Sequence, residues 1–101
     1  MKVVFAERAK RDIGDIYDRI AADNPSAAQR VEDMIRSTCE GLAHFPYAAA
    51  ATDEPNIHRL PLVRYPYTIF YRIAPERKRV EIARIVHSGR VQDLGRVPDA
   101  G

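Results

Sequence analysis

The chain has 101 residues, of which 46% are apolar and 30% charged, so it suits one small domain and leaves no room for a second core. Its single cysteine excludes a disulfide framework and a cysteine-rich zinc site, and its apolar runs are too short to span a membrane. The net charge of +2 hides an uneven distribution: residues 1–56 carry seven basic and ten acidic side chains, whereas residues 57–101 carry nine and four. The five glycines are isolated, which excludes a glycine-rich phosphate loop.

The first two predicted elements are a strand and an amphipathic helix. Residues 3–5 form a short β-branched and aromatic run that is typical of a strand. From Glu7 the apolar residues recur three and four positions apart, which predicts a helix that ends near Asp23. The apolar stripe of this helix consists of Ile13, Ile16, Tyr17 and Ile20. The charged residues between them are expected on the solvated face: Arg11, Asp12, Asp15, Asp18 and Arg19.

Asn24-Pro25 marks the start of a second helix, because Asn is a favoured N-cap and Pro is favoured at the first helical position. Its apolar stripe consists of Ala28, Val31, Ile35, Thr38 and Leu42. Gly41 weakens the last turn and Pro46 ends the helix, so the two helices should form an antiparallel hairpin. Cys39 flanks the stripe and is expected to be an inert buried thiol.

The remainder of the chain has β character. Residues 47–56 show no period and are predicted to be a loop, followed by strands at 57–60, 67–73 and 80–87. The middle one of these strands is apolar on both faces and is therefore expected at the centre of a sheet. The order β-α-α-β-β-β predicts an α+β fold, with the helical hairpin packed on one face of a small, mostly antiparallel sheet. We expect the opposite face to be exposed and rich in arginine.

Several segments, in this order and spacing, resemble the RelE/ParE toxins of type II toxin–antitoxin modules. The resemblance covers residues 1–92, which we expect to form a single domain, with 93–101 as a flexible tail beyond a frayed end after Ser88-Gly89. The segments that carry it are Asn24-Pro25 with Ala27-Ala28, Leu42, Pro46, Arg59, the run YTIFYRI at 67–73, Ile82, Ile85 and His87 to Arg90. The alanine-rich stretch at 47–56 departs from the pattern, since relatives often carry a glycine after the proline.

Within this superfamily the chain looks more like ParE than RelE. RNA-cutting relatives usually carry an arginine just before the apolar part of the third strand, where this chain has Tyr67 or Thr68. The ending His87-Ser88-Gly89-Arg90 is similar to the ParE pattern. The resemblance therefore implies a non-catalytic toxin that inhibits DNA gyrase by protein binding, forms a hetero-oligomer with a cognate antitoxin, and reaches operator DNA only through that antitoxin.

Two alternatives remain open on the same fold. One is a ribosome-dependent endoribonuclease that cuts mRNA without a metal, and the other is a non-toxic member that acts in antitoxin-dependent operator regulation. All three expectations place the protein in the cytoplasm, because charge follows the first apolar run too soon for a signal peptide. None of them requires a cofactor or a membrane.

The candidate catalytic residues for RNA cleavage are His87, Arg90 and Arg59. Metal-free cleavage needs a base, an acid and a cation for the developing phosphorane charge, and splayed bases need aromatic surfaces. The aromatic candidates are Tyr65, Tyr67, Phe70 and Tyr71. Against this interpretation, a lone histidine at a strand end is more often structural, and the parity of residues 67 and 71 favours core packing. His87 and Arg84 should also face opposite sides unless a bulge intervenes.

The candidate binding residues are Arg59, Arg72, Arg84 and Arg90. Arg59 and Arg72 are the best candidates for the exposed face, whereas Arg84 could pair with a helix carboxylate such as Asp15. A cationic surface of this kind would suit an acidic–apolar antitoxin segment that folds on binding. His44 and His58 lack partners at metal-ligand spacing, so no metal site is expected.

Overall fold

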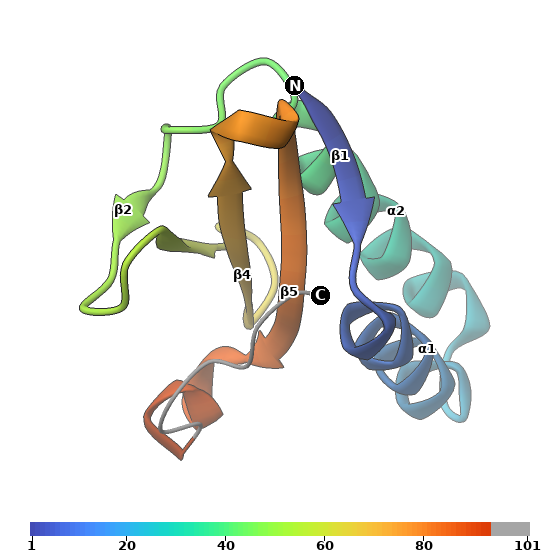
Figure 1. Cartoon of the computed structure of the whole chain (residues 1–101). Coiled ribbons are helices and arrows are strands. Elements are labelled where there is room, and N and C mark those ends of the chain that lie inside the picture. The colour runs from blue at the N-terminus through green and yellow to red at the C-terminus, as the bar shows by residue number, and fades with distance from the viewer. Residues whose placement is uncertain (94–101) are drawn as a thin grey trace.

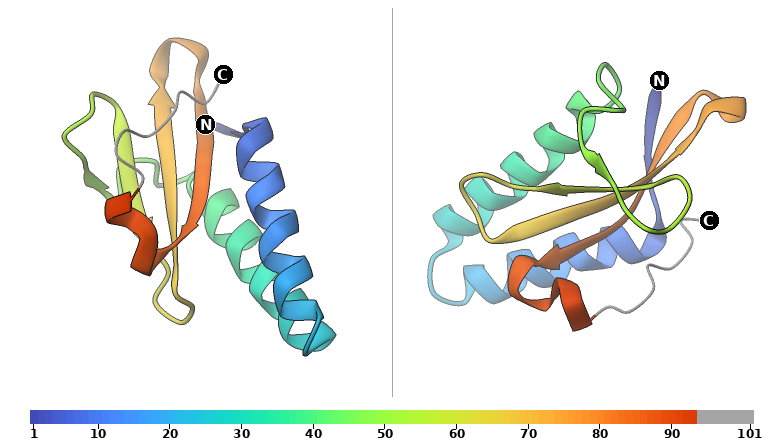
Figure 2. Two further views of the ribbon diagram at one scale, coloured as in Figure 1. Left: turned by 90° about the horizontal axis from the view of Figure 1, so that it is seen from below. Right: turned by 90° about the vertical axis from the view of Figure 1, so that its left-hand side faces the viewer.

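The computed structural model describes residues 1–93 as two helices packed on a five-stranded sheet (Figure 1). The elements in chain order are β1 (Lys2–Phe5), α1 (Glu7–Ala21), α2 (Pro25–Gly41), β2 (Ala50–Ala51), β3 (Ile57–Pro61), β4 (Tyr67–Ala74), the 3-10 helix η1 (Pro75–Arg77), β5 (Arg79–His87) and the 3-10 helix η2 (Ser88–Asp93). The strand order is β1-β5-β4-β3-β2, with β1 parallel to β5 and every other pair antiparallel. Figure 2 shows both helices on the same side of the sheet. The predicted α+β fold is confirmed.

The helical hairpin follows the predicted caps and stripes, with one exception. The side chain of Asn24 accepts a hydrogen bond of 3.0 Å from the Ala27 N–H, and Pro25 opens α2. The buried residues of α2 are Ala28, Val31, Ile35 and Cys39, so the stripe confirms the helical period. The exception is Asp12, which was expected on the solvated face of α1 and is instead buried beside Ile13.

Strand β4 is the centre of the sheet, as its two apolar faces predict. Seven of its eight residues are buried, and only Arg72 is half-buried. Tyr67, Ile69, Tyr71 and Ile73 pack in the core beneath the helices. Phe70 faces the other way and packs with Ile57, Val86 and Val91 of η2. The second face is therefore rich in arginine, as expected, since it carries Arg59, Arg72 and Arg79, but it is only partly open because apolar side chains close much of it.

Two short elements lie where the sequence shows no periodic pattern. In the predicted loop at 47–56, β2 pairs with β3, and the hydroxyl of Tyr71 donates to the Pro46 carbonyl at 2.8 Å. The expected frayed end after Ser88-Gly89 is wrong as far as Asp93, since Ser88 bonds to Thr68 through their hydroxyls at 2.9 Å and its N–H donates to Pro66 at 2.8 Å. Two or six residues are too few to establish a period. The rest of the predicted tail, 94–101, lies outside the described residues.

A bulge divides β5 into two parts. Phe70 of β4 faces Arg84, whereas the next residue, Tyr71, faces Ile82, so Ala83 has no partner in the register. The first part of β5 pairs with β1, which ends opposite Ile82. The second part therefore has an edge that β1 does not cover.

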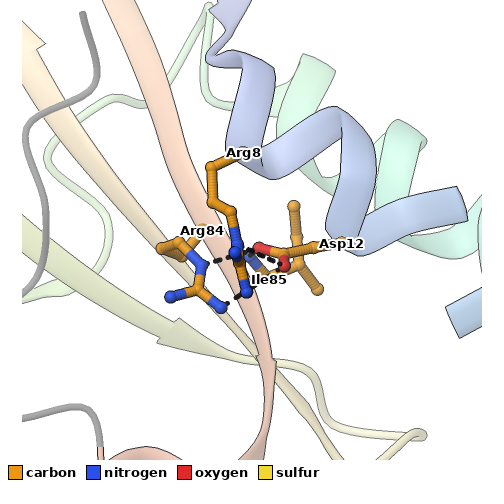
Figure 3. A network of polar contacts seen from close by, with 4 residues as sticks. All are labelled: Arg8, Asp12, Arg84 and Ile85. Carbon is orange, nitrogen blue, oxygen red and sulfur yellow. Dashed lines mark hydrogen bonds and ion pairs between the residues drawn. The ribbon is translucent and has the colours of Figure 1, made fainter. Parts of the chain in front are cut away.

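Asp12 of α1 occupies this uncovered edge (Figure 3). Its Oδ2 accepts the Ile85 N–H at 3.0 Å and Arg84 Nε at 2.9 Å, and its Oδ1 accepts Arg84 Nη2 and Arg8 Nε, each at 3.3 Å. A buried strand N–H must find an acceptor, and here a carboxylate takes the place of a neighbouring strand. Arg84 thus pairs with a helix carboxylate, as expected, although the partner is Asp12 and not the suggested Asp15, which lies one turn later on the same helix.

We expect Asp12→Ala to lower the free energy of unfolding by about 3 kcal/mol, because it leaves the largely buried Arg84 and the Ile85 N–H without their acceptor. The matched control is Asp18→Ala, which removes an exposed carboxylate from the same helix and should cost less than about 0.5 kcal/mol. Urea unfolding followed by circular dichroism measures both values. Equal losses in the two variants would contradict a stabilising role for Asp12.

Candidate functional site

A concave site lies between α1 and the C-terminal part of β5, and we call it the α1–β5 pocket. Its volume is about 270 Å³. The charged residues that line it are Arg8, Asp12, Asp15, Arg19, Arg84 and Arg90, together with His87. Its apolar lining consists of Ile16, Tyr67, Ile85 and Val86, all of them buried. The pocket therefore combines buried apolar surface with a surplus of guanidinium groups.

The structure brings some of the candidate residues together and separates others. The α1–β5 pocket is lined by His87, Arg84 and Arg90. Arg84 and His87 belong to opposite faces of β5, but both reach the pocket because it lies along the edge of the strand. Arg59 lies instead in a second concavity, of about 430 Å³, beside Thr68. The three candidate catalytic residues thus do not form one site.

His87 has a structural role at the start of η2. Its Nδ1 accepts the Gly89 N–H at 3.1 Å, as a capping side chain does at the beginning of a helix. Its ring meets Tyr67 edge to face, with 5.7 Å between ring centroids. Because Nδ1 is an acceptor in this arrangement, the neutral ring carries its proton on Nε2. In this conformation neither ring nitrogen is an unengaged base.

The second concavity lacks acid–base chemistry. It is lined by Arg59, Pro61, Thr68, Ser88 and Val91, of which Arg59 is the one ionisable residue. Thr68, one of the two residues found where RNA-cutting relatives usually carry an arginine, is buried and hydrogen-bonded to Ser88. This surface can bind an anion through Arg59, which is exposed, but among its described residues it presents no group that would move a proton.

Arg72 is not a residue of an open face. Its Nη2 donates to Glu81 Oε1 at 3.3 Å, and Arg79 Nη2 donates to Glu81 Oε2 at 2.6 Å. The Glu81 side chain is only 4% exposed, so the two arginines neutralise a buried carboxylate. Arg72 therefore lies on the face opposite the helices, as predicted, but half-buried and paired with Glu81, whereas Arg59 is exposed on that face.

The aromatic candidates for base stacking lie in the protein interior. Tyr67, Phe70 and Tyr71 are buried, and Tyr65 packs partly buried against the core. Burial also raises the pKa of the Tyr71 hydroxyl above its ordinary value. These rings cannot stack on a nucleotide without rearrangement of the core.

The sequence analysis did not identify two of the arginines that line the pocket. Arg8 and Arg19 lie on α1 with Asp12 and Asp15, in the series 8, 12, 15, 19. Steps of four, three and four residues place side chains on one face of a helix. This charged series runs beside the apolar stripe and could have identified the face of α1 that lines the pocket.

Cys39 is fully buried in α2, as expected. Burial raises the pKa of its thiol to about 12. Since the thiolate is the reactive form of cysteine, the folded protein protects this residue both sterically and electrostatically.

Comparison with proteins of known structure shows that the fold is shared with several bacterial toxins. The chain superposes with a TM-score of 0.74 and 23% identity on a chain of the chromosomal ParDE toxin–antitoxin system of Pseudomonas aeruginosa, covering 86% of this chain and 95% of that one. The isolated RelE toxin of Escherichia coli gives a TM-score of 0.63 at 16% identity, covering 86% and 83% of the two chains. At these identities the match establishes the fold alone.

The sequence comparisons define the family. The family described as the ParE toxin of the type II toxin–antitoxin system parDE matches residues 3–92. A Sinorhizobium fredii protein named as a candidate toxin, Y4kP, is 33% identical over 87 residues, which cover 86% of this chain and 88% of the relative. The chain belongs to the ParE toxin family. Within residues 1–93, neither helix is long and apolar enough to cross a membrane.

Arg72→Ala should destabilise the protein by about 1–2 kcal/mol, because the buried Glu81 loses one of its two arginine partners. Arg59→Ala, which removes an exposed arginine from the neighbouring strand, should change the free energy of unfolding by less than about 0.5 kcal/mol. Denaturant melts of the two variants provide the comparison. The same small effect in both would show that Arg72 contributes nothing to holding Glu81.

The Cys39 thiol should resist modification until the protein unfolds. With a pKa of about 12, the thiolate fraction at pH 8 is on the order of one in ten thousand. We expect a thiol-reactive disulfide reagent to label the native protein only at the rate of unfolding, and the urea-unfolded protein at once. Rapid labelling under native conditions would contradict the described burial.

Proposed function

We propose that this ParE-family toxin inhibits DNA gyrase by protein–protein binding and is neutralised by a cognate antitoxin. The observation that carries the proposal is the combination of a ParE match over residues 3–92 with a concavity around Arg59 whose described lining residues include no general base. A toxin that binds its target needs shape and charge complementarity, whereas one that cuts RNA needs positioned acid and base groups.

The arrangement of the candidate catalytic residues supports binding over cleavage. Nδ1 of His87 is engaged by Gly89, and Arg84 is held by Asp12 through two hydrogen bonds. Arg59 lies in a separate concavity. In the described structure, the histidine that would act as the base is therefore engaged and Arg59 is set apart from it, which leaves Arg90 as the one candidate catalytic cation beside His87.

An antitoxin partner is supported by the proteins that share this fold. The similar structures include the intact RelBE toxin–antitoxin complex of Escherichia coli and the RelBE2 toxin–antitoxin complex of Mycobacterium tuberculosis. By analogy, we infer that the present chain also forms a complex with an antitoxin. The cationic C-terminal half of the chain would favour an acidic segment of that partner.

Ribosome-dependent cleavage of mRNA is the second candidate. The observation that favours it is that His87 and Arg90 share the α1–β5 pocket. A conformational change that released His87 from Gly89 would supply an imidazole base beside a cation. This alternative makes a different experimental prediction.

Expression of the chain without its antitoxin should arrest growth, and the purified toxin should block supercoiling of relaxed plasmid by gyrase. His87→Ala should retain this inhibition, as should the control His44→Ala, which alters an exposed histidine outside the pocket. Uninhibited supercoiling at saturating toxin would contradict the proposal. Message cleavage in a translating extract that is lost in His87→Ala but not in His44→Ala would establish the nuclease instead, and absence of growth arrest would favour a purely regulatory role.

A further inference from the structure

The α1–β5 pocket carries two arginines that form no ion pair within the part of the chain that the structure describes. Arg19, in the last turn of α1, and Arg90, in η2, are both exposed and line the same concave site. Neither forms an ion pair with a residue in the described range 1–93. Like charges that converge on a concavity repel one another and concentrate the electrostatic field there, so the site favours an anion.

The acidic residues of the pocket offset only part of this charge. Both carboxylate oxygens of Asp12 are already occupied by Arg84, Arg8 and the Ile85 N–H. Asp15 is exposed and makes no ion pair with a described residue. Four guanidinium groups therefore share two carboxylates, one of which has no lone pair readily available for a further partner.

Arg8 is positioned to bind a second acid. It contacts Asp12 through Nε, and its side chain is 50% exposed (Figure 3). Its two terminal nitrogens form no hydrogen bond with a residue of the described chain. A guanidinium group held at one edge can donate two parallel hydrogen bonds from another edge to an incoming carboxylate. Asp12 thus holds Arg8 beside the α1–β5 pocket through Nε and leaves both terminal nitrogens of Arg8 as donors for a ligand.

The apolar lining restricts the chemistry of the ligand. Ile16, Ile85 and Val86 line the pocket beside the arginines, and each is buried except for the small surface it offers there. Tyr67 in the lining is 6% exposed and meets the His87 ring edge to face, which leaves that imidazole as the one exposed ring among the described lining residues. A peptide that carries a carboxylate beside an aliphatic side chain fits these features better than a nucleic acid.

We propose that the α1–β5 pocket binds an acidic–apolar segment of the antitoxin, with a partner carboxylate held by Arg8, Arg19 and Arg90 and an adjacent aliphatic side chain against Ile16 and Ile85. This inference rests on the proposed function, which supplies the antitoxin as the partner. It places the principal charge contact at the edge of the sheet, on the side of α1, rather than on the sheet face that carries Arg59.

The test compares two double charge reversals. Arg19→Glu/Arg90→Glu alters the pocket, and Arg11→Glu/Arg30→Glu makes the same change in net charge at exposed helix residues outside it. The probe is the purified antitoxin encoded beside the toxin gene, and calorimetric titration at several salt concentrations measures its affinity. We expect the pocket variant to lose at least about 30-fold in affinity and much of the salt dependence, and the control to lose less than about 3-fold. Both variants should melt as the parent does, since the four arginines are exposed.

The outcomes separate this inference from the proposed function. If the unaltered toxin does not bind the antitoxin, the partnership itself is contradicted. If it binds and the pocket variant binds equally well, the location is wrong while the partnership stands. Equal losses of antitoxin affinity in the two double variants would indicate only long-range charge attraction and would also contradict the α1–β5 pocket as the binding site. Binding of an oligouridylate that the pocket variant alone loses, with antitoxin affinity unchanged, would assign the site to RNA instead.

Discussion

The buried carboxylate of Asp12 determines how the helical hairpin meets the sheet. Because β1 pairs with only the first part of β5, the second part would have an unpaired backbone edge inside the protein, and Asp12 supplies the acceptor that this edge needs. The same carboxylate binds Arg84 from the strand and Arg8 from the helix. A single side chain therefore closes the sheet edge, orients α1, and fixes the polar face of that helix toward β5.

The location of the α1–β5 pocket follows from this contact. Once the face of α1 that carries Asp12 lies against β5, Arg8 and Arg19 must lie beside the end of the strand, close to His87 at its last position and to Arg90 of η2. Arg59 is excluded from this group, since it belongs to β3 and to the opposite face of the sheet. Within residues 1–93, the concavity around Arg59 is thus separate from the α1–β5 pocket. Of these two sites, the pocket at the sheet edge combines several arginines with apolar surface, which suits protein recognition.

The sequence predicted the elements whose signals are local and missed the features that depend on distant contacts. Helical periodicity, the Asn24 cap and the two-sided apolar pattern of β4 located the helices and the central strand. Asp12 resembled any charged residue between apolar positions, because its acceptor role depends on an N–H 73 residues away. Arg72 and Arg59 looked equivalent for a similar reason, since only the tertiary structure places a buried glutamate beside one of them. Of the pocket residues, sequence reasoning identified Arg84, His87 and Arg90, but the charged series on α1 was interpreted as a solvated face.

The unpaired Ala83 has a consequence for how this protein could change over generations. Before the bulge the even-numbered residues Val80 and Ile82 face the helices, and after it the odd-numbered residue Ile85 does, because Ala83 adds one residue between them. Loss of Ala83 would restore plain alternation along β5, with Ile82 and Ile85 still facing the helices and the pairing with β1 intact. The strand can therefore lose one codon at the bulge without exchanging its inward and outward residues, whereas loss of a second residue there would exchange them in the part of the strand that lines the pocket.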